Sequence, residues 1–312
     1  MNNKDTTYSA FIAIVGRANV GKSSILNRLL GQKIAIVSDK PQTTRTRIMG
    51  VLTKEEKQLI FVDTPGFHKP KNKLGEKMME SVSSGLSNVE AVALIVEAAP
   101  KFKLHPDDMP KAELALLEEI KKRNLKSVLV INKIDLLKNK SDLLPIISAY
   151  TALHDFDAVL SVSATNGDGI DDFCEQMLKY AKSAPHFFAA DEVTDQADSV
   201  IVTELIREKM LLLLDKEVPH GIAVGLERFY ERDTTSGEPI IEIEATVYCE
   251  RDSHKGIIIG KSGATLKKIG TLARADIEKF FGCKVNLKIW VKVKEDWRNR
   301  DGLIRSFGLS MK

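Results

Sequence analysis

The sequence contains few cysteines and few aromatic residues, and it has no long apolar run. Its three cysteines, Cys174, Cys249 and Cys283, are far apart and form neither a CxxC motif nor a Cys/His metal-binding spacing. We therefore expect reduced, partly buried thiols in a reducing cytoplasm. No apolar stretch approaches the roughly 20 residues that a membrane span requires, and the N-terminal stretch MNNKDTTYSA lacks the basic and apolar regions of a secretory signal. These absences argue against an exported or membrane-spanning protein.

Composition and length favour a globular protein with two domains. Aromatic residues make up 6% and charged residues 29% of the 312 residues, and no low-complexity tract is present. A chain of this length exceeds the usual size of one domain. Residues 185–250 carry 5 Lys and Arg against 15 Asp and Glu, whereas residues 251–312 carry 15 against 6. Clustered lysines are commonly a solvated face, but here they surround a glycine-rich loop, which favours a polyanionic partner.

Short apolar runs alternate with amphipathic segments from about residue 11 to residue 180. Runs such as FIAIVG, QLIFV and SVLVI are each followed by a helix-length periodic stretch. This alternation predicts parallel strands buried between helices, and hence an α/β doubly wound, mostly parallel sheet. Ligands of such sheets bind beyond the carboxyl ends of the strands. We assign this first domain to residues 1–184.

The periodicity is interrupted in the segment KSAPHFFAADEVTD, where proline, alanine and acidic residues predict a linker over residues 185–198. Residues 199–312 then have the pattern of a helix, two strands, two helices and a strand, and the tail predicts one more helix. This order predicts a smaller α+β domain, in which a small sheet carries helices on one face.

A glycine-rich loop lies between the first apolar strand and an amphipathic helix. It satisfies the pattern GxxxxGK[ST]. The backbone amides of such a loop converge on the β-phosphate at a helix N-terminus, while the lysine reaches the β- and γ-phosphates and the serine hydroxyl binds Mg²⁺. The loop alone does not distinguish ATP from GTP. The residues expected at the phosphates are Gly16, Asn19, Val20, Gly21, Lys22, Ser23, Ser24 and, from a later segment, Gly66.

The segment DTPG directly follows the apolar strand LIFV. Its Asp63 carboxylate can hold the Mg²⁺ shell through water, and the Gly66 amide can face the γ-phosphate. We interpret Asp63, Thr64 and Pro65, together with the following Phe67, as a nucleotide-sensing switch.

Two further segments follow later strands and indicate guanine. NKID, with Asn132, Lys133 and Asp135, closes the strand SVLVI. Only guanine offers a ring N–H and an exocyclic amine side by side for the Asp135 carboxylate to accept. SAT adds Ser163 and the Ala164 amide, which can bind the guanine oxygen. NKID alone would more often be a helix cap, but four motifs in order predict GTP as the ligand and oppose an ATP-dependent kinase or ATPase.

The four motifs and the C-terminal half together resemble the Era family of bacterial GTPases over nearly the whole chain. In that family, a threonine just before an arginine in the first switch completes the Mg²⁺ shell. The stretch PQTTRTR offers Thr43 and Thr44, and we prefer Thr44 because it precedes Arg45. The resemblance thus implies hydrolysis of GTP to GDP and phosphate, with Ser23, Thr44 and Asp63 holding Mg²⁺.

The residue after the DTPG glycine departs from the Ras pattern. Ras-like proteins place a glutamine there, which orients the attacking water, but this chain has Phe67. We therefore expect slow intrinsic hydrolysis, with the water held by other groups. In related GTPases, a P-loop asparagine at the place of Asn19 helps to bind K⁺ beside the phosphates. We extend that role to Asn19 as a hypothesis, whose alternative is a simple turn residue.

A second GKS tripeptide, in the C-terminal domain, does not fit the phosphate-loop pattern because Lys255 stands where a glycine is needed. It fits GxxG between two short helices. Such a loop brings backbone amides and a lysine against the phosphodiester backbone of about four nucleotides, beside an apolar groove. We expect residues 257–259 and the following helix to line that groove. The residues predicted to contact RNA are Gly260, Lys261, Ser262, Gly263, Lys267 and Lys268.

The predicted order of elements matches the type II KH fold, and the Era resemblance implies single-stranded RNA near the 3′ end of the small-subunit rRNA. We interpret the chain as a GTPase that binds this rRNA and acts in assembly or maturation of the small ribosomal subunit. The alternative is a membrane-associated cell-cycle signalling GTPase with incidental RNA binding, whose basic C-terminal helix associates weakly with anionic lipid at the inner face of the membrane.

Overall fold

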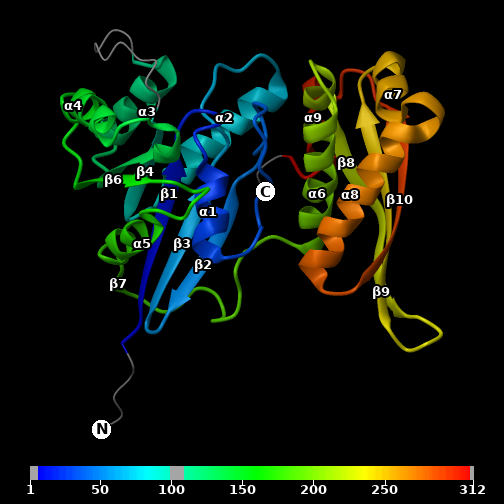
Figure 1. The fold of residues 1–312 in the computed structure, drawn as a ribbon, viewed down its shortest axis with the longest axis horizontal. Helices are drawn as coiled ribbons and strands as arrows, with labels where there is room; N and C mark the ends of the chain where they lie inside the picture. The colour runs from blue at the N-terminus through cyan, green and yellow to red at the C-terminus, as the bar shows by residue number, and fades with distance from the viewer. Residues whose placement is uncertain (1–5, 99–108, 310–312) are drawn as a thin grey trace. The chain divides into compact units, whose positions relative to one another are not determined.

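The structure is a computed structural model that describes residues 6–98 and 109–309. Contacts divide the chain into two units, which are drawn in Figure 1. Two short segments of the N-terminal half belong to the second unit by their contacts. The first unit comprises, among the described residues, 6–35, 44–69, 78–98 and 109–195, and the second comprises 36–43, 70–77 and 196–309.

The first unit is built on a seven-stranded sheet in the order β2-β3-β1-β4-β5-β6, with β7 paired to β1. β1, β3, β4, β5 and β6 pair in parallel, and β2 runs antiparallel to β3. The mostly parallel sheet predicted from the alternating runs is therefore confirmed. The strands are β1 (Tyr8–Val15), β2 (Ile48–Lys54), β3 (Lys57–Asp63), β4 (Ala91–Glu97), β5 (Ser127–Asn132), β6 (Ala158–Val162) and β7 (Lys182–Ser183).

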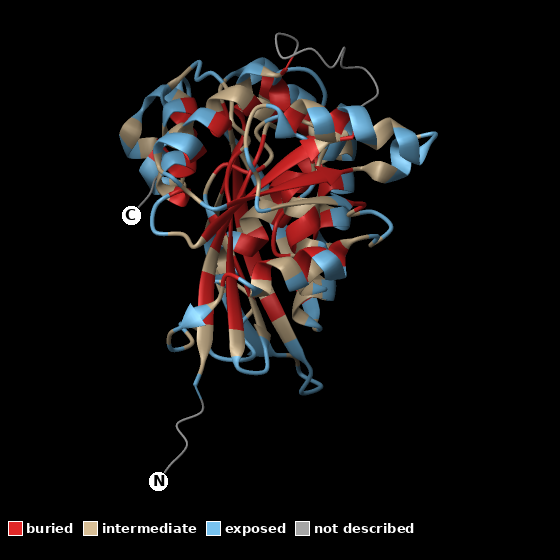
Figure 2. Cartoon of the chain, turned by 90° about the vertical axis from the view of Figure 1, so that its left-hand side faces the viewer, coloured by how far each residue is buried: buried red, intermediate tan, exposed pale blue. Residues whose placement is uncertain are grey.

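Helices cover both faces of this sheet. Ile12 and Ile14 of β1 pack in one core with α1 and α5, whereas Ala13 and Val15 pack in the other with α2, α3 and α4. A strand buried on both faces needs a continuous apolar run, which explains FIAIV. Figure 2 shows the buried residues concentrated along the strands. The helices are α1 (Lys22–Leu30), α2 (Lys73–Gly85), α3 (Lys111–Lys122), α4 (Leu143–Thr151) and α5 (Ile170–Leu178).

The second unit is a three-stranded sheet, ordered β10-β9-β8, with helices packed on one face. Along β9, Ile241, Ile243, Ala245 and Val247 are buried in one core with residues of α6 and α8. The predicted helix, two strands, two helices and strand are all present. Their bounds are α6 (Asp198–Leu213), β8 (Ala223–Asp233), β9 (Pro239–Cys249), α7 (Asp252–Ile259), α8 (Ala264–Phe281) and β10 (Lys284–Val293), and the tail adds α9 (Asp301–Ser306).

The expected linker is largely part of the first unit. Val51 N donates to Val193 O at 2.9 Å, and Thr194 Oγ1 donates to Met49 O at 2.8 Å. These bonds pair residues 193–194 with the edge strand β2, and the chain leaves the first unit only after Asp195.

The thiols and the helices also bear on the expectations from composition. All three cysteines are free; Cys174 and Cys249 are buried, and Cys283 is partly exposed. Within residues 6–98 and 109–309, no helix is both long enough and apolar enough to cross a membrane.

Candidate functional site

The glycine-rich loop connects β1 to α1, as its sequence pattern predicts. Gly21 has a φ of 97°, and a Cβ added there would lie 2.2 Å from Nδ2 of Asn132. Only glycine therefore allows the loop to approach the NKID segment this closely. Lys22 is buried, with 6% of its surface exposed, and its Nζ donates to the carbonyls of Gly16 (3.2 Å) and Arg17 (3.0 Å). The ammonium thus lies beneath the curled backbone of the loop.

Burial shifts both charged groups at the base of the loop. Desolvation lowers the pKa of Lys22 to about 8, although the nearby Asp63 carboxylate opposes this shift. Desolvation raises the pKa of Asp63 to about 6, against the opposing effects of Lys22 and of the hydrogen bond from Ser23. Each shift disfavours the charged form, so an anion near the lysine and a cation near the carboxylate would both be favoured.

Three oxygen-bearing side chains converge beside Lys22. Ser23 Oγ donates to Asp63 Oδ2 at 2.6 Å and lies 3.0 Å from Thr44 Oγ1. Asp63 Oδ1 is buried and has no hydrogen-bond partner among the described residues. Serine, threonine and aspartate oxygens are the hard donors that Mg²⁺ prefers, and a buried carboxylate oxygen without a hydrogen-bond partner fits such a cation.

The other predicted switch residues occupy different positions. Thr43 Oγ1 donates to Lys40 O at 2.5 Å and lies 2.8 Å from Ser38 Oγ, so it does not join Ser23. Thr64 is buried and donates to Ile14 O, and Pro65 is buried next to it.

The loop after DTPG lies directly against the phosphate loop. Phe67 N donates to Gly16 O at 3.2 Å, and Gly66 lies beside the Ala18 backbone. Asn19 has a φ of 66°, which suits a turn residue.

NKID, SAT and the phosphate loop are joined by hydrogen bonds. Asn132 Nδ2 donates to the carbonyl of the buried Val20 (2.8 Å), and its Oδ1 accepts from Ala164 N (3.1 Å). Ser163 Oγ donates to Asp135 Oδ1 at 2.5 Å, which orients an otherwise exposed carboxylate. Ser24 and Ala164 line one pocket of about 280 Å³.

An ion-pair network next to these motifs was not predicted from the sequence. Arg17 contacts Glu97 at 2.8 Å and the fully buried Glu113 at 3.0 Å, while Lys133 contacts Glu97 at 3.1 Å. Burial raises the pKa of Glu113, which also accepts a hydrogen bond from Tyr150. The network ties the phosphate loop to β4, α3 and NKID. Its only sequence signal is a glutamate that ends an apolar strand.

The GxxG loop projects from the second unit between α7 and α8. Gly260 has a φ of 72°, and a Cβ there would lie 2.2 Å from Thr265 Oγ1, so no larger residue fits. Ser262 and Gly263 also have positive φ values, 51° and 79°. Lys261 is exposed and, among the described residues, forms no ion pair.

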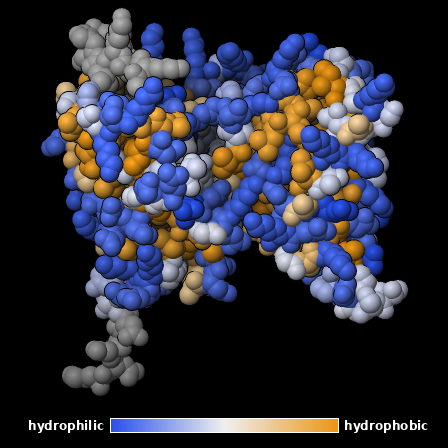
Figure 3. Space-filling view, in the orientation of Figure 1, coloured by the Kyte–Doolittle hydropathy of each residue, from blue (hydrophilic) through white to orange (hydrophobic). Residues whose placement is uncertain are grey.

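A groove of about 390 Å³ begins at this loop and follows α8 and β10. Apolar and basic side chains share its lining, and Lys268 lies outside it. The expectation that residues 257–259 line the groove is wrong. Ile258 is buried in the core, and Ile257 is half exposed on α7 outside the groove. Figure 3 shows hydrophobic surface around α7 and α8. The lining residues are Gly263, Leu266, Lys267, Gly270, Thr271, Arg274, Leu287 and Ile289.

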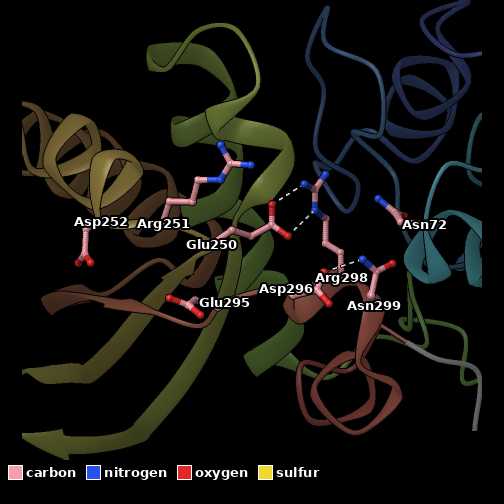
Figure 4. Close-up of a pocket in the computed structure, with 8 residues that line it drawn as sticks. All are labelled: Asn72, Glu250, Arg251, Asp252, Glu295, Asp296, Arg298 and Asn299. Atoms are coloured by element: carbon pink, nitrogen blue, oxygen red, sulfur yellow. Dashed lines mark hydrogen bonds and ion pairs between the residues drawn. The ribbon is translucent and has the colours of Figure 1, made fainter.

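A second pocket of the same unit, of about 480 Å³, has the opposite charge balance. Figure 4 shows Glu250 and Arg298 facing each other across two contacts. Four carboxylates and two arginines line it, so it does not favour a polyanion. The lining residues are Asn72, Glu250, Arg251, Asp252, Glu295, Asp296, Arg298 and Asn299.

Comparisons with known proteins match both units. A family model described as "50S ribosome-binding GTPase" matches residues 11–133, and one described as "KH domain" matches residues 217–298. GTPase Era of Ruminiclostridium cellulolyticum is 47% identical over 96% of this chain and 97% of its own. GTPase Era of Clostridioides difficile is 44% identical over 97% of this chain and 99% of its own.

Two solved structures also match nearly the whole chain, each with a TM-score of 0.90 and 34% identity, covering 98% of this chain and 100% of theirs. One is Era in complex with MgGDPNP and nucleotides 1506–1542 of 16S ribosomal RNA. The other is an Aquifex aeolicus Era variant bound to GDP.AlF4⁻. With relatives 44–47% identical over nearly its whole length, and with a GTPase domain followed by a KH domain, this chain belongs to the Era family of GTPases.

Proposed function

We propose that this GTPase hydrolyses GTP with Mg²⁺ and binds single-stranded RNA at the 3′ end of the small-subunit rRNA, acting in the assembly of that subunit. The observation that carries the proposal is an exposed GxxG loop that opens into a basic and apolar groove, in the same chain as a phosphate loop. The complex of a related Era with MgGDPNP and 16S rRNA supports both ligands.

Ser23, Thr44 and Asp63 would hold the Mg²⁺. Asp63 Oδ2 lies 2.6 Å and Thr44 Oγ1 lies 3.0 Å from Ser23 Oγ, and the second Asp63 oxygen, which has no hydrogen-bond partner among the described residues, fits a cation. When bound, the ion would supply positive charge against the negative charge that develops on the phosphates. Lys22 contributes a second positive charge, held in place by two loop carbonyls.

Mg²⁺ binding should weaken in acid. The pKa of Asp63 is about 6. Below that pH, protons compete with the metal for the carboxylate, and above it the carboxylate is ionised and available to the metal. We expect the Mg²⁺ affinity of the nucleotide complex to fall about tenfold per pH unit below pH 6. Titrating Mg²⁺ against a fluorescent GTP analogue from pH 5 to 8 measures this. Asp63→Asn should bind weakly without that dependence, and a flat wild-type profile contradicts the role of Asp63.

Guanine would be read by Asp135 and by the segment that follows β6. The Asp135 carboxylate, oriented by Ser163, would accept from the guanine ring N–H and amine, and the Ala164 amide, which donates to Asn132 Oδ1 in this structure, would donate to the guanine oxygen instead. Asn132 donates one hydrogen bond to Val20 and accepts one from Ala164, and its amide retains one N–H and one oxygen lone pair. It supports the site by joining its three segments.

The hydrolytic water must be oriented by a group other than a switch glutamine, because that position holds Phe67. We propose that Asn19 helps to hold K⁺ beside the phosphates. Replacing K⁺ by Na⁺ should then slow hydrolysis by on the order of tenfold. In Asn19→Gly, which keeps the positive φ but removes the side-chain oxygen, the two salts should give similar slow rates. Equal rates of the wild-type protein in K⁺ and Na⁺ rule this role out.

RNA would bind along the groove, with Lys261 and the loop amides at the phosphates and with Leu266 and Leu287 beside the bases. Fluorescence anisotropy of a single-stranded oligonucleotide with the rRNA 3′-end sequence tests this function, and a duplex of the same sequence is its control. Tight binding of the single strand alone is expected. Equal binding of both would contradict a KH-type site.

The membrane alternative receives less support from the tail. Helix α9 has six residues, and its Ile304 is fully buried within the second unit. Phe307, just beyond α9, packs on Trp297 and Tyr248. Ile304 and Phe307, which a surface helix would insert into lipid, therefore pack within the fold.

A further inference from the structure

The segment 36–43, which leads into the first switch, packs against α6 in the second unit. Val37 N donates to Glu208 Oε1 at 3.0 Å, and Lys40 Nζ donates to the carbonyl of Leu214, which caps α6. Neither contact was foreseen from the sequence, because the partners are more than 170 residues apart. They place a segment of the nucleotide-binding half within the contacts of the C-terminal unit.

Arg207 of α6 holds the end of this segment. It is 2% exposed, and its guanidinium donates to the carbonyls of Thr43 and, at 3.4 Å, of Gln42. Its Nε donates to Glu204 Oε1 at 2.8 Å, which fixes the plane of the guanidinium. A buried arginine directed at two successive carbonyls by a carboxylate is a rigid donor, since its fork leaves little freedom.

The backbone that Arg207 grips is strained. Gln42 has a φ of 63°, in the left-handed region that a residue with a side chain rarely adopts. Such a conformation persists only when its surroundings hold it. The Thr43 hydroxyl adds bonds to Ser38 and Lys40, so the turn is fixed from inside as well as by α6.

Holding the Thr43 carbonyl also determines the start of Thr44. The carbonyl of Thr43 and the amide of Thr44 belong to one planar peptide group, so fixing the first orients the second. Thr44 Oγ1 lies 3.0 Å from Ser23 Oγ in the cluster proposed to bind Mg²⁺. The conformation imposed at Thr43 thus restricts the position of the Thr44 backbone, from which the hydroxyl extends.

The part of α6 that carries Arg207 is itself anchored. Lys209 Nζ donates to Glu208 Oε2 at 2.8 Å and to Asp276 Oδ2 of α8 at 2.5 Å. Glu208 and Lys209 are buried, and breaking one partner of a buried charge pair is strongly unfavourable. The charged pairs of Lys209 therefore hold α6 against α8, and Arg207 on the same helix holds the segment 36–43.

We propose that Arg207 is a positioning residue for GTP hydrolysis: it fixes the first switch so that Thr44 presents its hydroxyl to Mg²⁺. This inference rests on the proposed Mg²⁺ role of Thr44. Arg207 itself touches neither the nucleotide nor the ion. Its effect should therefore appear in the metal requirement and in kcat, and only weakly in GDP affinity, because the switch threonine serves the triphosphate state.

The test compares Arg207→Met with the wild-type protein. We expect kcat for GTP to fall about 10- to 100-fold, as a misplaced group in a positioned site does, with a severalfold rise in the Mg²⁺ concentration for half-maximal rate. GDP affinity should change less than about twofold, within the range of a lost remote contact. Arg207→Lys, which keeps the charge but not the fork, should show the same changes in smaller degree and serves if Arg207→Met does not fold.

Two further variants separate the possible explanations. Arg298→Met removes another arginine–glutamate pair of this unit, the one with the partly buried Glu250, and controls for loss of stability without a switch contact. Thr44→Ala tests the proposed metal role directly. If Thr44→Ala leaves the Mg²⁺ requirement unchanged, that role fails. If it raises the requirement while both Arg207 variants match Arg298→Met, only the inference about Arg207 is overturned.

Discussion

Replacing Asp135 by asparagine should lower GTP affinity by about 10²- to 10⁴-fold, since two charge-assisted hydrogen bonds of about 1.5–3 kcal/mol each would be lost. The amide places a donor where guanine also presents donors. Xanthine offers an oxygen instead of the exocyclic amine, so the variant should gain affinity for xanthosine triphosphate. Competition between the two nucleotides for a fluorescent analogue measures this exchange of preference.

Asp142→Asn is the matched control for this change. Asp142 follows the same strand, makes no side-chain hydrogen bond at the helix it precedes, and undergoes the same chemical substitution. Its GTP affinity should remain that of the wild-type protein. Retained GTP preference in Asp135→Asn would show that another group reads the base.

Replacing Lys261 and Ser262 by aspartate should weaken RNA binding by about 100-fold or more, because like charges brought together cost several kcal/mol. The two carboxylates would face the phosphodiester backbone at the exposed turn of the GxxG loop. GTP binding should not change, since neither residue belongs to the first unit. Anisotropy with the rRNA 3′-end oligonucleotide measures the loss.

The chain offers a close control in another Lys-Ser dipeptide, Lys140-Ser141, which is exposed in the first unit. Lys140→Asp/Ser141→Asp makes the same change in charge, but in the first unit and not in the KH domain. RNA affinity should then fall only slightly, through the net charge. An equal loss in both double variants would mean that RNA responds to overall charge rather than to the GxxG loop.

The nucleotide motifs could be predicted because each is local. A parallel sheet brings the carboxyl ends of its strands to one edge, so four short motifs that each follow a strand must meet there. Ser23 and Asp63 are 40 residues apart and share a 2.6 Å hydrogen bond for this reason. The order of elements in the second unit was predictable for the same reason, since alternating and helical periods are read within each segment.

Contacts between distant segments could not be predicted. The ion-pair network joins residues of separate segments, Arg17, Glu97 and Glu113. The local sequence around each residue does not indicate which residue it pairs with. The same holds for Arg207 and the carbonyls before Thr44. The expectation for residues 257–259 was wrong for another reason. Three consecutive residues of a helix point in different directions, so when Ile258 packs in the core its neighbours cannot line the same surface with it.

The most direct measurement is GTP hydrolysis with and without the single-stranded rRNA 3′-end oligonucleotide, for the wild-type protein, Lys261→Asp/Ser262→Asp and the Lys140→Asp/Ser141→Asp control. We predict that RNA accelerates hydrolysis by the wild-type and control proteins and has no effect on the GxxG variant. That result would establish two linked phosphate-binding loops in one GTPase. Equal rates under all conditions would contradict the link, leaving a GTPase and an RNA-binding domain that only share a chain.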